Sequence, residues 1–150
     1  MTQNAGDRGF TLVEMMIVIT VMAILAAVAA PNFTSYMAHR RLNGAARQIM
    51  TDLMEARMRA VSQNNRFKMF FLDNHRYKVL DDANNNNTED SGETSTTKDI
   101  RDMYHDVTFS ATADPIFYPR GTAYGTTVTL TNSGGSKSVT VATAGRVKIQ

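Results

Sequence analysis

The chain has 150 residues, enough for one folded domain plus an anchor, and 43% of them are hydrophobic, as is usual for a chain with a folded core. Its 16 Lys and Arg against 14 Asp and Glu give a formal charge of +2 at pH 7, which is too small to identify a partner. The absence of cysteine excludes a disulfide framework and thiolate metal sites.

The first element is an apolar run over residues 10–30, FTLVEMMIVITVMAILAAVAA, which follows a short polar leader at residues 1–9. A helix of about 20 apolar residues spans the hydrocarbon core of a bilayer. In a secretory signal peptide the small-residue cleavage site follows the apolar core, whereas here the small residue, Gly9, precedes it. A cut after Gly9 would therefore remove the leader and leave the hydrophobic helix on the mature protein.

One charged residue, Glu14, lies within the apolar run. An ionisable group in a membrane helix costs about 2.5–3.5 kcal/mol, so it is a functional candidate. Its carboxylate is close to the N-terminus of its own helix, where the helix dipole favours negative charge, and in a helix bundle it can meet the N-terminal amine of a neighbouring copy. We expect Glu14 to act in assembly; the alternative is a tolerated polar residue near the membrane interface.

This N-terminal region resembles the type IV pilin signature. The resemblance is carried by Gly9-Phe10-Thr11-Leu12-Val13-Glu14, by the apolar helix, and by Pro31 at its end. It implies that a prepilin peptidase cuts after Gly9 and methylates the new Phe10 amine. It also implies that residues 10–31 first cross the membrane and later join other pilins in the helical core of a filament.

The charges that flank the apolar run do not decide its orientation, because Arg8 on one side is matched by Arg40 and Arg41 on the other. The resemblance to pilins implies a single-pass inner-membrane protein with its head in the periplasm. The chain would then move into a pilus filament or to the cell surface.

Residues 32–62 have the pattern of an amphipathic helix. Apolar residues recur every three or four positions on one face, at Leu42, Ala45, Ala46, Ile49, Leu53, Ala56 and Ala60. Residues 10–62 are therefore expected to form one long helix with weak points at Pro31 and Gly44. Because proline lacks a backbone donor, we expect the segment near Pro31 to bend or melt on assembly.

A row of methionines, Met50, Met54 and Met58, runs beside this apolar face. Flexible thioether side chains fill irregular gaps, so we expect the row to pack in the core against a sheet. Contact with neighbouring subunits is the alternative.

Beyond residue 62 the pattern becomes that of short β-strands. Apolar, β-branched or aromatic runs occupy residues 66–72, 77–80, 107–109, 116–118, 128–130, 139–141 and 147–149. Turn residues separate them at 73–74, 119–121, 125 and 132–135. Alternation predicts buried side chains at Val128, Leu130, Val139, Val141, Val147 and Ile149. The expected fold class is α+β, with a small antiparallel sheet over residues 63–150 forming a head on the distal half of the helix.

The C-terminal half resembles the GspH/FimT family of minor pilins and pseudopilins. The matching residues are Ile116 to Gly121, Gly125 to Leu130 and Gly145 to Ile149, and residues 81–106 are unmatched. The family includes components of type IV pili and of type II secretion pseudopili. Since Pro31 is typical of the pilus members, the resemblance favours a minor pilin of a type IV pilus, acting in assembly initiation or in a tip complex. A type II secretion pseudopilin of the GspH type is the alternative.

Two cations near the C-terminus, Arg146 and Lys148, are two residues apart and would share the exposed face of a strand. Arg120 and Lys137, both expected in turns, would extend this basic ridge. Some members of the resembled family act in DNA uptake through a Gly-Arg-x-Arg motif, which implies DNA binding in natural transformation. Here Lys replaces the last Arg, so the charge is kept and the bidentate geometry is lost. A plain solvated strand face is the alternative.

A polar stretch over residues 81–99 has calcium-loop spacing at Asp82, Asn84, Asn86 and Glu93, with Asn87 where glycine is required. No helix precedes the stretch, and its composition is that of a mobile loop, so we expect a loop there rather than a calcium site.

Other catalytic or metal-binding patterns do not occur in the sequence. The three histidines are scattered without ligand spacing, and no nucleophile motif or phosphate-binding glycine loop is present. We therefore expect a protein that is not an enzyme and needs no cofactor or metal. Its expected partners are other pilins, the prepilin peptidase, the inner membrane and, in the DNA-uptake alternative, DNA.

Overall fold

The computed structural model of the chain describes residues 9–150, except for the side chains of residues 29–32. The chain divides into two compact units, one ending at Ser35 and the other, the head, covering Tyr36–Gln150. The leader before Gly9 and the side chain of Pro31 lie outside the described residues. The expectations of cleavage and of bending near Pro31 therefore stay predictions.

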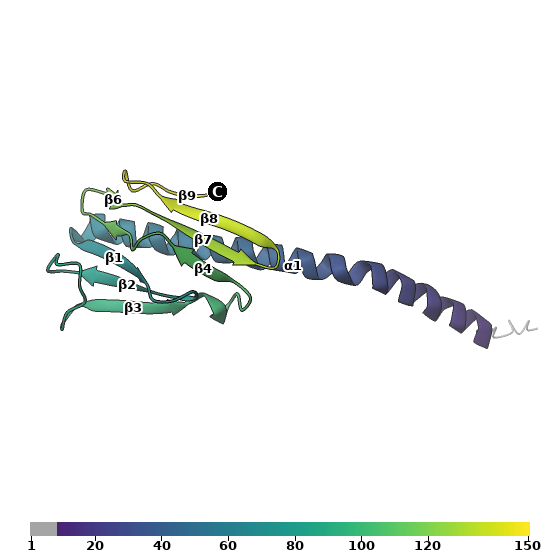
Figure 1. Cartoon of the computed structure of the whole chain (residues 1–150). Helices are drawn as coiled ribbons and strands as arrows, with labels where there is room; N and C mark the ends of the chain where they lie inside the picture. Colours follow the sequence, from purple (N-terminus) through teal and green to yellow (C-terminus); the bar gives the residue numbers. More distant parts are fainter. Residues whose placement is uncertain (1–8) are drawn as a thin grey trace, which may run out of the picture. The chain divides into compact units, whose positions relative to one another are not determined.

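A single helix, α1, covers Leu12–Gln63 (Figure 1). Thr11 precedes it, and its hydroxyl oxygen accepts a hydrogen bond of 3.2 Å from the backbone N–H of Glu14, as a helix N-cap does. The helix ends where Asn64 takes the left-handed conformation, with φ of 57°, a usual C-terminal stop. The long helix predicted over residues 10–62 is confirmed.

Within residues 9–150 the chain forms nine strands, arranged in two antiparallel sheets. The first sheet has the order β3-β2-β1-β5-β6, from Thr94–Asp99, Arg76–Asp82, Arg66–Phe71, Ile116–Phe117 and Ala123–Tyr124. The second has the order β4-β7-β8-β9, from Thr108–Ala111, Thr126–Asn132, Gly135–Val141 and Val147–Ile149. A 3₁₀ turn, η1, covers Ile100–Asp102. The α+β fold class is confirmed, but the expected single sheet is in fact two.

The core of the head lies between the distal half of α1 and the two sheets. All seven residues of the predicted apolar face of the helix are at most 2% exposed. They pack with aromatic and β-branched side chains from both sheets, which include Phe67, Phe117, Val128 and Val139. Of the six strand residues predicted to be buried, four are buried, and Val147 and Ile149 are half-buried.

The methionine row on α1 is split by the structure. Met50 is half-buried and packs against the core, as predicted. Met54 and Met58 are 43% and 63% exposed, so the core interpretation is wrong for these two. The buried face of α1 is too narrow to include Met54 and Met58. Small alanines on that face bring the helix close to the sheets, so the side chains beside the face stay exposed.

The polar stretch is partly strand. Residues 81–82 belong to β2, and residues 94–99 form β3, so the predicted loop is wrong at both ends. The sequence of β3, TSTTKD, lacks apolar alternation because its side chains lie at the edge of the sheet, where six register pairs with β2 hold the strand.

A bidentate ion pair joins α1, within the head, to the segment just before β4. Arg41 Nε and Nη2 donate to the two carboxylate oxygens of Asp106 at 2.7 and 2.9 Å. Asn132 also donates to Asp106, at 3.1 Å, and to the carbonyl of Ala38, at 2.8 Å. The hydrogen bond from Arg41 is the main reason why the pKa of Asp106 lies below its ordinary value.

Candidate functional site

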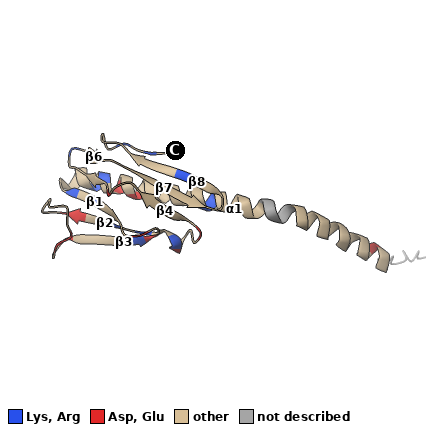
Figure 2. Cartoon of the chain, viewed as in Figure 1, with Lys and Arg blue, Asp and Glu red and all other residues tan. Residues whose placement is uncertain are grey.

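Residues 12–28 of α1 present apolar side chains to the surroundings along their whole length. The large hydrophobic residues there are 45% or more exposed. The helix contains an 18-residue window of mean hydropathy 2.6, none of it buried, so by length and composition it can cross a membrane. Figure 2 shows this part of α1 without Lys or Arg. An exposed apolar helix of this kind needs lipid or other helices around it.

Glu14 lies in the first turn of α1. With Thr11 as N-cap, the sequence Thr11-Leu12-Val13-Glu14 matches the capping box, in which the acidic residue three positions on also favours the helix start. Its position next to the helix N-terminus suits a carboxylate, as the sequence predicts. The capping box is a second, local reason for an acidic residue here, which the sequence-based argument did not consider.

The cations predicted to form a basic ridge are only partly on one surface. Arg146, Lys148 and Arg120 are exposed. Lys137 lies in β8 and not in a turn, which corrects the sequence-based expectation. Lys148 pairs with Thr140 on β8, so Lys137, three residues before Thr140, is on the opposite strand face. The ridge therefore does not extend to Lys137.

Two turns that carry arginines touch each other. A Cβ at Gly145 would lie 1.9 Å from the carbonyl oxygen of Gly121, so the backbones before Arg146 and after Arg120 are in close contact. Arg57, which is exposed on α1, donates to the same Gly121 oxygen at 3.0 Å. This contact brings a helix cation beside the two turns. Sequence reasoning missed Arg57, because nothing in the helical pattern links it to residues more than 60 positions away.

The candidate calcium residues are engaged within their own loop. The buried Asp82 carboxylate accepts the backbone N–H groups of Asn86 and Asn87 at 3.0 and 2.9 Å. Glu93 accepts backbone N–H groups at 3.4 and 3.1 Å from Asn84 and Asp90. The side chain of Asn84 donates to Asp90 at 2.8 Å, and that of Asn86 donates to the same oxygen. In the part of the chain that the structure describes, no three His, Asp or Glu side chains form a group that could hold a metal.

A buried polar cluster joins α1 to the edge of the first sheet. Asp52 is 3% exposed, and its carboxylate accepts hydrogen bonds from Lys98 Nζ at 2.7 Å and from the hydroxyl of Tyr77. Gln48 donates to both carboxylate oxygens at 3.3 and 3.2 Å. Burial, and then the bond to Asp52, raises the pKa of Tyr77 far above its ordinary value, so this hydroxyl stays a donor.

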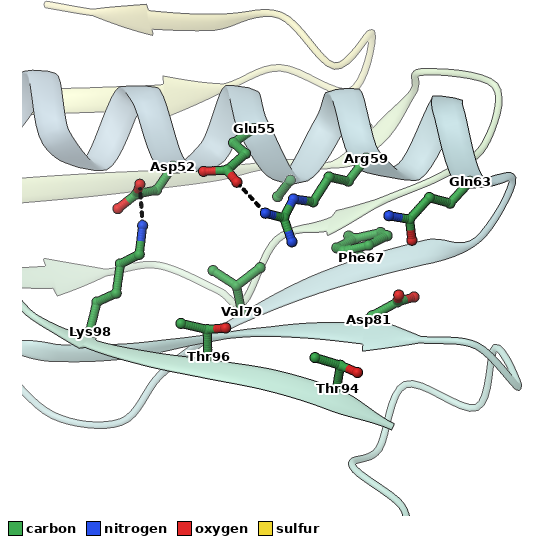
Figure 3. A pocket seen from close by; sticks show the side chains of 11 residues that line it. Asp52, Glu55, Arg59, Gln63, Phe67, Val79, Asp81, Thr94, Thr96 and Lys98 are labelled. Atoms are coloured by element: carbon green, nitrogen blue, oxygen red, sulfur yellow. Dashed lines mark hydrogen bonds and ion pairs between the residues drawn. The ribbon is translucent and has the colours of Figure 1, made fainter. Parts of the chain in front are cut away.

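Beside this cluster a cleft of about 370 Å³ opens between α1 and the strands β1, β2 and β3 (Figure 3). Asp52 and Lys98 form one end of it, and Gln63 and Asp81 lie toward the other. An ion pair of 2.6 Å between Glu55 and Arg59 lies along the helix side.

Comparison with known protein families decides the classification. The family model described as Type II transport protein GspH matches residues 45–145, about two thirds of the chain. The chain belongs to the GspH family. The model for the prokaryotic N-terminal methylation motif matches residues 4–30, which include Gly9, Phe10 and Glu14. This GspH-family chain is therefore of the minor pilin and pseudopilin class, a class of structural subunits.

Curated relatives of this GspH-family chain are similar over part of its length. The type IV major pilin PilA of Myxococcus xanthus is 39% identical over 67 residues, 45% of this chain and 30% of the relative. The type IV major pilin PilE of Neisseria gonorrhoeae is 48% identical over 42 residues, 28% of this chain and 25% of the relative. The chain thus spans less than a third of the length of these relatives.

Solved structures support the same fold class for this family member. The type IV minor pilin FimU of Pseudomonas aeruginosa matches with a TM-score of 0.60 at 16% identity, covering 77% of this chain and 92% of that one. The minor pseudopilin EpsH of Vibrio cholerae matches with a TM-score of 0.56 at 12% identity, covering 73% of this chain and 96% of that one. At these identities the likeness concerns the fold alone.

Proposed function

We propose that this chain is a minor pilin of a type IV pilus. The observation that carries the proposal is a combination of two features: a capped helix whose first part, residues 12–28, bears Glu14 and exposes its large apolar side chains, and a GspH-type head. The exposed apolar residues require a membrane before assembly and neighbouring helices after it. The similarity of part of the chain to type IV major pilins, together with Pro31 at the end of the apolar run, favours a pilus over a secretion pseudopilus.

In this proposal the chain is a single-pass inner-membrane protein with its head in the periplasm. A prepilin peptidase removes residues 1–9, the Phe10 amine is methylated, and the mature subunit joins other pilins through residues 10–31. The role is structural, without catalysis or cofactor. A pseudopilin of a type II secretion system is the alternative with the same helix and head.

The processing can be measured directly on sheared surface filaments. Mass spectrometry of these filaments is expected to detect this chain with an N-terminal peptide that begins at methylated Phe10. A Gly9→Leu variant is expected to stay in the membrane at its unprocessed mass, because it replaces the small residue at the proposed cut with a large one. Recovery of the chain only from a secretion apparatus, with filaments that lack it, would favour the pseudopilin alternative.

A second candidate function is DNA binding by the head. The contact between the Gly121 and Gly145 turns favours this function. Arg120 and Arg146 are next to the two glycines in sequence, and Arg57 donates to the Gly121 oxygen. In this proposal these three cations act together with Lys148, and all four residues are exposed. Few cations bind a phosphate backbone weakly and without sequence preference, and the affinity falls as salt rises.

An electrophoretic shift of double-stranded DNA with the detergent-solubilised full chain tests this function. At low salt a shift is expected, and Arg146→Ala with Lys148→Ala is expected to weaken binding about tenfold or more. Lys137→Ala is the matched control, because it removes one cation from the opposite strand face, and it is expected to leave the shift nearly unchanged. Absence of a shift with the unaltered protein at low salt would contradict DNA binding.

A further inference from the structure

The cleft beside β3 exists because the strand presents polar side chains, two of them short threonines, toward the helix. Thr94, Thr96 and Lys98 of β3 pair in register with Asp81, Val79 and Tyr77 of β2. Directly paired residues share a sheet face, so all six are on the side toward α1. Threonines cannot fill the space that large apolar residues would fill at these positions, and the cleft of about 370 Å³ remains.

The cleft has an apolar floor and a charged rim. Ala56, Phe67 and Val79 form the floor, as Figure 3 shows for the labelled Phe67 and Val79. On the rim, Asp52 is paired with Lys98 at 2.7 Å, and Glu55 is paired with Arg59 at 2.6 Å. An elongated side chain with an apolar stem fits a site of this composition.

Asp81 gives the residues that line the cleft a net negative charge. Among the described residues its carboxylate makes a hydrogen bond of 3.3 Å with Asn65 and no ion pair. The other four charged residues that line the cleft neutralise one another in pairs. Asp81 is therefore the acidic group that remains available for a cation from outside.

The strand next to the cleft is an open edge. In the part of the chain that the structure describes, β3 pairs with β2 alone and is the outermost strand of its sheet. It contains no proline or bulge, and its one lysine turns inward to Asp52 and so does not protect the edge. An edge of six residues offers backbone donors and acceptors to an added strand.

We propose that the β3 edge and the cleft together bind an extended segment of a neighbouring filament subunit, with a Lys or Arg side chain of that segment in the cleft. The backbone of the segment pairs with β3, the stem of the side chain lies over Phe67 and Val79, and its cationic end reaches Asp81. This interface rests on the proposed filament function and deepens it, because it assigns to the head a contact separate from the packing of the apolar helices.

Photo-crosslinking in filament-forming cells tests the contact. The photoreactive amino acid p-benzoylphenylalanine is placed at Thr97, an exposed residue of β3 on the strand face away from the cleft, so that the cleft stays open. The control position is Ser110, an exposed residue on the edge strand β4 of the other sheet. The expected result is a cross-link from position 97 to an extended pilin segment that carries Lys or Arg, with several-fold less product from position 110. Equal products from both positions, or none from position 97 in filaments that contain the chain, would overturn the proposal.

Substitutions give an independent measurement. Thr96→Trp fills the cleft and is expected to reduce the amount of this chain in sheared filaments about tenfold, whereas Ser110→Trp is expected to leave it unchanged. Asp81→Asn keeps the shape of the cleft and is expected to give a smaller reduction of the same kind, so the test does not depend on whether the Trp variant folds. Normal incorporation of both cleft variants would refute the interface. If both cleft variants and the unaltered chain are recovered from filaments in equal amounts, the filament function stands without this interface. If the unaltered chain is itself absent from filaments, the filament function is contradicted.

Discussion

Glu14→Gln is expected to insert in the membrane normally and to be lost from filaments by about tenfold or more. Insertion should not suffer, because the change removes the cost of about 2.5–3.5 kcal/mol for an ionised group in the apolar segment. Assembly should suffer, because removing one partner of a buried charge pair costs about 2–5 kcal/mol, and the Phe10 amine of the neighbouring subunit would be left unpaired. The measurement is the ratio of this chain in sheared filaments to that in the membrane fraction.

The choice of glutamine separates two roles of Glu14. Thr11 caps α1 through the N–H of Glu14, and a capping box accepts either Glu or Gln at this position, so Glu14→Gln keeps the helix start and removes only the charge. Glu14→Ala removes the charge and also the polar side chain that a capping box has at this position, while the backbone N–H that bonds Thr11 remains. Asp102→Asn, which changes an exposed carboxylate of the head in η1, away from the cleft, is the control for loss of one charge. Normal incorporation of Glu14→Gln together with loss of Glu14→Ala would show that the cap matters and that the charge pair does not.

The helix was predictable from local patterns alone. The apolar run, the three-and-four spacing from Leu42 to Ala60 and the stop after residue 62 depend on residues close in sequence, and the structure has α1 at Leu12–Gln63. The strands with β-branched or aromatic alternation were also placed correctly, for the same reason. Their division between two sheets was not, because pairing joins strands that are distant in sequence, such as β4 with β7 and β1 with β5.

The features missed near the candidate sites share a physical cause. β3 has no apolar period because it is an edge strand whose ladder with β2 and ion pair with Asp52 stabilise it. The cleft, and the arrangement of Arg57 beside Gly121, depend on contacts between segments 40 or more residues apart. The exposure of Met54 and Met58 depends on how far two sheets wrap around a helix. None of these features can be predicted from the pattern of residues that are close together in the sequence.

The C-terminal Gly-Arg pair combines a structural residue with an exposed cation. Gly145 has φ of 78°, a conformation that favours glycine, and a Cβ there would lie 1.9 Å from the Gly121 carbonyl oxygen, a backbone atom that cannot move aside alone. The turn also carries the Gly145 N–H bond of 2.8 Å to the Ala142 carbonyl. The glycine of the motif is therefore explained by packing of two turns, without reference to DNA.

Gly145→Ala is accordingly expected to destabilise the head by about 3 kcal/mol or more, the sum of the left-handed backbone penalty and the displacement of the Gly121 turn. For a domain of this size such a loss lowers the thermal midpoint by about 10 °C or more, measured by circular dichroism of the detergent-solubilised chain. Gly92→Ala is the matched control, because Gly92 also has a positive φ, 103°, but no atom lies within 4 Å of its Cβ position. It should lose only about 1–2 kcal/mol. Equal losses of stability in the two variants would contradict the close contact at Gly145. A larger loss in Gly145→Ala would confirm that the glycine is needed for the packing of the turn. If this variant also bound DNA more weakly, the cause would then be the displaced turn and not a missing phosphate contact.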